Sequence, residues 1–178
     1  MKNSIGIHAL VWSGTWNLKD IENSIKLSKQ LGYDLIEIPL LDPFNFDIKN
    51  TKKYLDKYKF NSVTSLGLSE ETDISSSEEQ HRINGKKILE KALDVTFELG
   101  SDYMGGVLYS ALAKYHHPPN NESKKRSAEI LHHLSIKAKN YGIKIGLEPV
   151  NRYESNLINT AQQAIDFINM ADSDNLYV

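Results

Sequence analysis

Apolar positions along the chain follow two spacings that alternate from the first segment to the last. Short runs place an apolar residue at every second position, as Ile36 and Ile38 do, which is the pattern of a β-strand. Longer segments repeat every three or four positions, as Leu18, Ile21 and Ile25 do, which is typical of an amphipathic helix. The strict alternation of the two patterns predicts an α/β protein with a mostly parallel sheet.

The predicted elements form βα units of roughly 30 to 40 residues, about the length that a (β/α)8 barrel uses. Strands are expected at residues 4–8, 34–40, 60–66, 102–107, 143–147 and 175–178. Helices are expected to begin near residues 18, 47 and 76, after residue 121, and near residue 161. Five complete units and the start of a sixth strand predict an incomplete (β/α)8 TIM barrel, with residues 1–178 as one partial domain. A doubly wound open sheet is the alternative, but the first strand-to-helix turn has no glycine-rich phosphate-binding fingerprint.

Local signals mark where several elements begin and end. Asp47 is placed to cap the second helix. Two overlapping Ser-x-x-Glu patterns, which start at Ser75 and Ser76, predict capping boxes for the third helix. The acidic loop of residues 69–79 is expected to be a solvated cap or lid, and residues 108–121 are expected to form a long loop.

The composition is that of an ordinary soluble globular protein, with 40% hydrophobic and 25% charged residues. A net charge of -2 provides no field for nucleic acid or an anionic membrane, so neither is expected as a partner. The chain has no cysteine, which excludes disulfides, thiolate metal sites and a cysteine nucleophile. Because the sequence shows neither a signal-peptide core nor a run long enough to span a membrane, the expected location is the cytoplasm.

Ionisable side chains follow three of the predicted strands at the end where α/β proteins keep their chemistry. In the fifth strand the apolar positions alternate and lead to Glu148, which therefore faces the barrel axis rather than the helices. By the same alternation, Glu37 on the second strand and His8 on the first face the axis. An inward carboxylate is costly unless it binds something, which makes Glu148 the first candidate for chemistry. For Glu37 and His8, a strand-end polar group satisfied by a neighbouring loop is an equally good interpretation.

Further candidates come from the loops at the same end. Arg152 and Glu154 either form an ordinary surface ion pair or orient the carboxylate of the fifth strand and bind a polyhydroxylated ligand. Trp12 and Tyr109 are predicted to lie on loops, where their rings can pack against the apolar face of a sugar. Trp16 has a similar position, but its ring could equally cover the first helix as part of the core.

Several segments resemble those of one family. The stretch LEPVNRYESNLINT, residues 147–160, resembles the metal-binding strand and loop of the D-tagatose 3-epimerase (D-psicose 3-epimerase) group, within the xylose isomerase-like TIM barrels. LGYDLIEIPL resembles the second-strand segment of this group, TSLGLSEETDISS its third-strand loop and MGGVLYS its fourth strand. The similarity runs in order over essentially the whole chain, and the EPxNRYE-type segment is specific for the group.

The resemblance implies an enzyme that inverts C3 of a small-molecule ketose through a cis-enediolate. It also implies a divalent cation, Mn²⁺, Co²⁺ or Mg²⁺, held by two glutamates, an aspartate and a histidine, with the glutamates exchanging the C3 proton. Glu148 matches the first of these glutamates and is thus the expected metal ligand and acid-base. The expected substrate-binding residues are His8, Trp12, Glu37, Tyr109, Arg152 and Glu154. A homo-oligomer is expected.

The other ligands implied by the resemblance are an aspartate shortly after Val178 and a histidine and a glutamate on the seventh and eighth strands. Residues 1–178 are therefore expected to be the front part of an epimerase and to be inactive alone. Two alternatives stay open. One is a related barrel isomerase that acts on hydroxypyruvate, an inosose or another sugar, and the other is a non-catalytic fragment that binds a partner through its open sheet edge.

Overall fold

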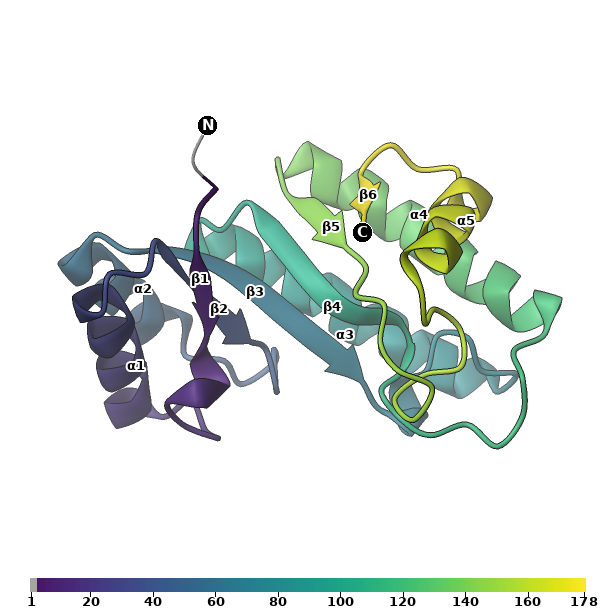
Figure 1. Cartoon of the computed structure of the whole chain (residues 1–178), viewed down its shortest axis with the longest axis horizontal. Helices are drawn as coiled ribbons and strands as arrows, with labels where there is room; N and C mark the ends of the chain where they lie inside the picture. Colours follow the sequence, from purple (N-terminus) through teal and green to yellow (C-terminus); the bar gives the residue numbers. More distant parts are fainter. Residues whose placement is uncertain (1–2) are drawn as a thin grey trace.

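A computed structural model describes residues 3–178 as one curved parallel sheet, along which the helices follow each other in chain order (Figure 1). The strands are β1 (Gly6–His8), β2 (Leu35–Pro39), β3 (Asn61–Leu68), β4 (Tyr103–Ala111), β5 (Lys144–Gly146) and β6 (Leu176–Tyr177). The helices are α1 (Leu18–Gln30), α2 (Ile48–Tyr58), α3 (Glu79–Leu99), α4 (Asn121–Asn140), α5 (Ala161–Ala171) and the 3-10 turns η1 (Ala9–Val11) and η2 (Glu70–Thr72). The strands pair in the order β1 to β6, each parallel to its neighbours. This sequential order confirms the predicted barrel topology and excludes a doubly wound sheet, whose strand order reverses.

The two faces of the sheet differ in the way that strand alternation predicts. On β2, Ile36 and Ile38 are fully buried, while Glu37 between them is partly exposed on the opposite face. His8 pairs in register with Glu37, so both side chains lie on the inner face of the curve. The alternation of the first predicted strand also places Ile5 on the side of the helices, but this residue is largely exposed because it precedes β1 at the open edge of the sheet.

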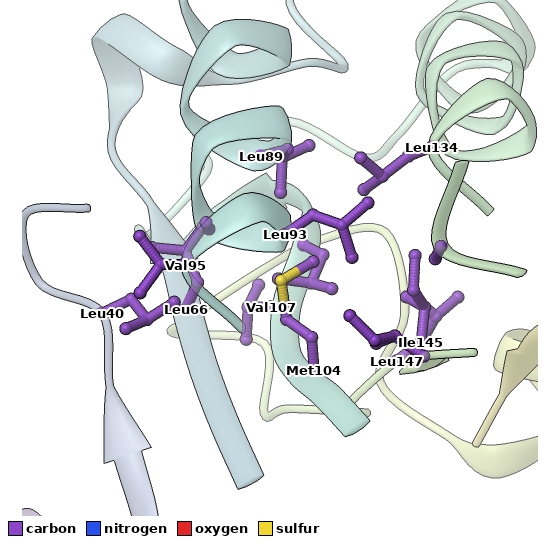
Figure 2. Close-up of a cluster of buried hydrophobic side chains, with 14 of the residues drawn as sticks. Leu40, Leu66, Leu89, Leu93, Val95, Met104, Val107, Leu134, Ile145 and Leu147 are labelled. Atoms are coloured by element: carbon purple, nitrogen blue, oxygen red, sulfur yellow. The ribbon is translucent and has the colours of Figure 1, made fainter. Parts of the chain in front are cut away.

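Hydrophobic side chains from the outer face of the sheet and from the helices form one buried cluster (Figure 2). Met104 of β4 and Ile145 of β5 belong to this cluster, together with Leu93 of α3 and Leu134 of α4. Each fully buried side chain of this size stabilises the fold by about 1.5–3 kcal/mol. Leu18, which was expected on the inner side of the first helix, is exposed because it occupies the first position of α1.

Helix starts follow the sequence signals at α2 but not at α3. Asp47 caps α2, since its carboxylate accepts a hydrogen bond of 3.0 Å from the backbone N–H of Asn50. The two capping boxes predicted for α3 are wrong. The helix begins after Glu78, which makes no side-chain cap bond, and the Ser76 hydroxyl accepts a hydrogen bond only from the N–H of Glu78.

The reason for the different start of α3 is Asp73. Its carboxylate accepts hydrogen bonds from both the backbone N–H and the hydroxyl of Ser75, which removes that hydroxyl from the helix end. A capping box forms earlier, between Ser69 and Thr72 at η2. The loop of residues 69–79 therefore folds back on itself, and its central residues are buried, which corrects the expectation of a solvated lid.

β4 extends further than the sequence predicts. It runs to Ala111 instead of ending at Val107, so the loop that follows is shorter than residues 108–121. The four added residues are buried, and burial of a regular backbone requires that its N–H and C=O groups stay paired. Gly106 within β4 has a φ of +117°, a conformation that favours glycine, and the pairing with β3 shifts register after Gly67.

We expect Gly106→Ala to lower the free energy of unfolding by about 2 kcal/mol or more. An alanine rarely adopts this φ, and its Cβ would collide with the carbonyl oxygen of Leu66. Gly14→Ala is the matched control, because a Cβ there meets nothing within 4 Å. Urea unfolding followed by circular dichroism measures both variants, and equal stabilities would contradict the close approach of β3 and β4.

Candidate functional site

A cavity of about 490 Å³ opens on the inner face of the sheet, and its volume lies in the range usual for small-molecule sites. Its polar lining includes His8 from β1, Glu37 from β2 and Ser65 from β3. Glu148 and Glu154 join them from the segment that follows β5. The fold thus brings four of the side chains selected from the sequence, one imidazole and three carboxylates, around a single hollow.

The imidazole of His8 links the first three strands. Its Nδ1 accepts a hydrogen bond of 3.2 Å from the backbone N–H of Leu10, so the proton of the neutral ring belongs on Nε2. Nε2 lies 3.4 Å from Oγ of Ser65 and 3.6 Å from Oε1 of Glu37. His8 therefore presents a donor between a hydroxyl and a carboxylate, an arrangement suited to binding neighbouring hydroxyl groups of a ligand.

β4 fixes the backbone of Glu148 on both sides. The N–H of Glu148 donates to the carbonyl of Gly106 at 3.1 Å, and its carbonyl accepts a hydrogen bond of 2.8 Å from the Tyr109 hydroxyl. Ile145 and Leu147 are buried on the side of the helices. Alternation consequently turns the carboxylate of Glu148 toward the cavity, where it remains accessible.

The sequence predicted Tyr109 on a loop, but the residue lies on β4. Its side chain is fully buried, with its ring centroid 6.2 Å from that of Phe167 of α5. The hydroxyl donates to the carbonyls of Glu148 and Ile158, and burial raises the pKa of the phenol above its ordinary value, which keeps it a donor. A ring enclosed in this way cannot pack against a sugar, so Tyr109 instead holds the segment that carries Glu148.

Arg152 and Glu154 line different hollows. The carboxylate of Glu154 accepts a hydrogen bond from the Asn151 side chain, and its carbonyl accepts one of 2.8 Å from the N–H of Ala113. Arg152 lines a separate surface groove, and within residues 3–178 it makes no ion pair with Glu154. Of the two, only Glu154 faces the cavity.

Neither tryptophan is part of the cavity lining. The indole N–H of Trp12 donates to Oγ of Ser28 on α1 at 2.8 Å, which turns the ring toward that helix. Trp16 donates to Oγ1 of Thr51 on α2 at 3.0 Å and stacks on Phe46. Trp16 therefore packs against the core, the alternative left open by the sequence, and Trp12 is held away from a ligand in the cavity.

Sequence reasoning missed Tyr103, which lies on the inner face at the start of β4. Its ring packs against Gly105 and Gly146, and a Cβ at Gly146 would overlap the Tyr103 hydroxyl. Burial raises the pKa of this phenol, and the charges of Glu37 and Glu148 raise it further. The one signal in the sequence that could have indicated this packing is Gly146, two residues before Glu148, because a glycine at this position leaves room for a neighbouring ring.

Residues 3–178 contain no group of three or more His, Asp or Glu side chains arranged to hold a metal ion. Glu148 provides one carboxylate, whereas Glu37 and His8 come from strands on the other side of β3 and β4. A complete ligand set is therefore not formed by the described residues. In the same part of the chain, no helix has both the length and the apolar character needed to cross a membrane.

Comparison with known proteins identifies the family. The family described as xylose isomerase-like TIM barrel matches residues 25–178. The chain belongs to the xylose isomerase-like TIM barrel family. It is 38% identical over 172 residues to a ketose 3-epimerase from Arthrobacter globiformis. It is 39% identical over 173 residues to an L-ribulose 3-epimerase from Methylomonas sp. (strain DH-1).

A solved structure shows the same architecture. This family member superposes on the crystal structure of a D-allulose 3-epimerase from Methylomonas sp. in complex with D-allulose, with a TM-score of 0.96 and 39% identity. That match covers 98% of this chain and 61% of the other, and both curated relatives are matched over 97% of this chain. The chain spans 60% of the length of those two relatives.

We expect Tyr109→Phe to lower the free energy of unfolding by about 1–3 kcal/mol, because two buried carbonyls lose their common donor. Tyr33→Phe is the matched control, since the Tyr33 ring packs against the core and its hydroxyl has no hydrogen-bond partner among residues 3–178. Urea unfolding measures both. A loss no larger than that of the control would contradict the anchoring of Glu148 by Tyr109.

Proposed function

We propose that this chain carries part of the active site of a ketose 3-epimerase and that its substrate is a free ketose. The observation that supports the proposal most is the carboxylate of Glu148, turned into a polar cavity. The family members that the chain matches at 38% and 39% identity are named ketose 3-epimerase and L-ribulose 3-epimerase. The alternating donors and acceptors of His8, Glu37 and Glu154 suit a molecule with a hydroxyl group on nearly every carbon.

In the proposed reaction, the carboxylate of Glu148 removes the proton from C3 of the ketose. The electron pair of the C3–H bond forms a C2–C3 double bond, and the carbonyl electrons move onto the C2 oxygen, which gives a cis-enediolate. Delivery of a proton to the opposite face of C3 by a second acid completes the inversion, and the family resemblance assigns that acid to a position outside residues 1–178. His8, Glu37 and Glu154 bind sugar hydroxyls and so hold C3–H against Glu148.

A divalent cation, which we propose to be Mn²⁺ or Co²⁺, would stabilise negative charge on the substrate oxygens when bound. Glu148 is the residue of this chain that we assign as one of its ligands, because oxygen donors suit such ions. The described residues form no larger cluster, so the other ligands are assigned to positions outside residues 1–178.

The test joins residues 1–178 to the part of the Methylomonas L-ribulose 3-epimerase that lies outside the match. We expect this fused enzyme to convert D-fructose to D-psicose. Glu148→Gln should lower kcat by about 10³-fold, because an amide is nearly isosteric but cannot accept the C3 proton. Glu129→Gln, an exposed position on α4, is the matched control and should leave kcat unchanged.

Chelation of divalent ions is expected to abolish turnover in the fused enzyme, and Mn²⁺ or Co²⁺ should restore it. A loss of only a few-fold in Glu148→Gln would contradict the acid-base role. Turnover of hydroxypyruvate or an inosose without turnover of any ketose would favour the related isomerase instead.

A second candidate function rests on the edges of the sheet. Among the described strands, β1 pairs only with β2 and β6 only with β5, so both leave backbone N–H and C=O groups free for another chain. Ile5 and Val178 beside these edges are exposed. We propose that residues 1–178 associate with a second copy through these edges, in line with the homo-oligomer expected from the sequence.

The cytoplasmic location stays a prediction.

Sedimentation velocity on residues 1–178 alone should therefore show dimers or larger species. Because a single carboxylate holds a divalent ion weakly, we also expect no epimerisation of D-fructose when Mn²⁺ is added in excess. A monodisperse monomer with epimerase activity that a chelator removes would contradict both expectations.

A further inference from the structure

Asp73 and Tyr115 form a partly buried contact between the loop that follows β3 and the loop that follows β4. The hydroxyl of Tyr115 donates to Oδ2 of Asp73 at 2.6 Å. Oδ1 of Asp73 accepts hydrogen bonds from the N–H and the hydroxyl of Ser75, at 2.8 and 2.7 Å. Asp73 is only 6% exposed, and a carboxylate so deeply buried is costly unless both oxygens have donors, as they do here.

Regular structure holds both partners of this contact in place. The N–H of Ala111, the last residue of β4, donates to the hydroxyl oxygen of Tyr115 at 3.0 Å. The guanidinium of Arg126 on α4 donates twice to the carbonyl of Ser75, at 3.0 and 3.2 Å. The loop backbone packs closely against Gly85 of α3, where a Cβ would collide with the carbonyl oxygen of Thr72. The contact is therefore fixed by β4, α3 and α4 together.

The segment between this contact and the cavity is short. Leu112 lines the cavity, and its N–H donates to the carbonyl of Leu68 at 2.7 Å. The N–H of Ala113 donates to the carbonyl of Glu154 at 2.8 Å, and Glu154 lines the cavity as well. A few residues thus join the contact between the Asp73 carboxylate and the Tyr115 phenol to one apolar and one acidic residue of the cavity lining.

We propose that Asp73 and Tyr115 are positioning residues that hold Leu112 and Glu154 at the rim of the cavity and thereby set the affinity for the sugar. This role rests on the proposed epimerase function, since neither side chain lines the cavity. Loss of the contact frees residues 111–115 and displaces the hydroxyl-binding carboxylate, but it leaves the acid-base on its β5 segment in place. The kinetic effect therefore falls on KM rather than on kcat.

Tyr115→Phe tests the proposal because it removes the hydroxyl and keeps the ring. Tyr141→Phe is the matched control, since the Tyr141 hydroxyl also donates to a carboxylate, that of Asp94, at 3.2 Å. Hydrogen exchange of residues 1–178, read by mass spectrometry, should become about tenfold faster at residues 111–115 in Tyr115→Phe. Exchange in β2 and β3 should not change, and Tyr141→Phe should leave residues 111–115 as protected as in the parent.

In the fused enzyme, Tyr115→Phe and Asp73→Asn should each raise KM for D-fructose about fivefold, with kcat within about twofold of the parent. A fall in kcat without a rise in KM overturns the positioning role. Exchange at residues 111–115 within about twofold of the parent overturns it as well, and so does faster exchange across the whole sheet, which indicates a purely structural role. A fused enzyme without epimerase activity would refute the proposed function and, with it, the effect on sugar affinity. Because exchange needs no turnover, the exchange result would still decide whether the contact between Asp73 and Tyr115 holds residues 111–115.

Discussion

The positive φ of Gly106 and its close approach to Leu66 of β3 are the constraint on which the arrangement of the cavity depends. Beyond Gly106, β4 stays buried, and Val107 and Ala111 still pair with Gly67 and Leu68 of β3. The carbonyl of Gly106 accepts a hydrogen bond from the N–H of Glu148, and the Tyr109 hydroxyl donates one to the carbonyl of Glu148. At its end, Ala111 holds Tyr115. A single strand thus positions the proposed acid-base and the loop that shapes the rim.

The most reliable predictions from the sequence came from strand alternation, because it is a local property of the chain. Once a stretch is a strand, the direction of every second side chain is fixed, and for this reason Glu37, His8 and Glu148 could be assigned to one face. Tyr109 was misplaced because the length of β4 is set by contacts with β3 and α5, which a single segment does not reveal. The direction of Arg152, in an irregular loop, could not be predicted for the same reason.

The start of α3 shows how a local signal loses to a tertiary contact. The sequence places Ser75 where a helix cap is expected, yet its hydroxyl binds Asp73 instead. Asp73 is buried and must be satisfied, whereas an exposed helix end can take its hydrogen bonds from water. The larger cost of an unpaired buried carboxylate decides the competition, and the pattern that resembles a capping box becomes part of the support for the cavity.

The two faces of the sheet carry different kinds of residues: the side chains of the outer face stabilise the fold, and those of the inner face carry the proposed chemistry. Side chains on the outer face, such as Ile36 and Met104, are fully buried, so their truncation removes packing and weakens the whole fold. Glu37 and Glu148 on the inner face are partly solvated, so isosteric substitution changes their chemistry at small cost in stability. Asp73 belongs to neither class, because it is buried like the core and yet contacts the segment that shapes the site. Substitution of such a residue changes protection against hydrogen exchange near the cavity and leaves it unchanged elsewhere in the sheet. This local effect distinguishes it from the residues of the outer face and from those of the inner face.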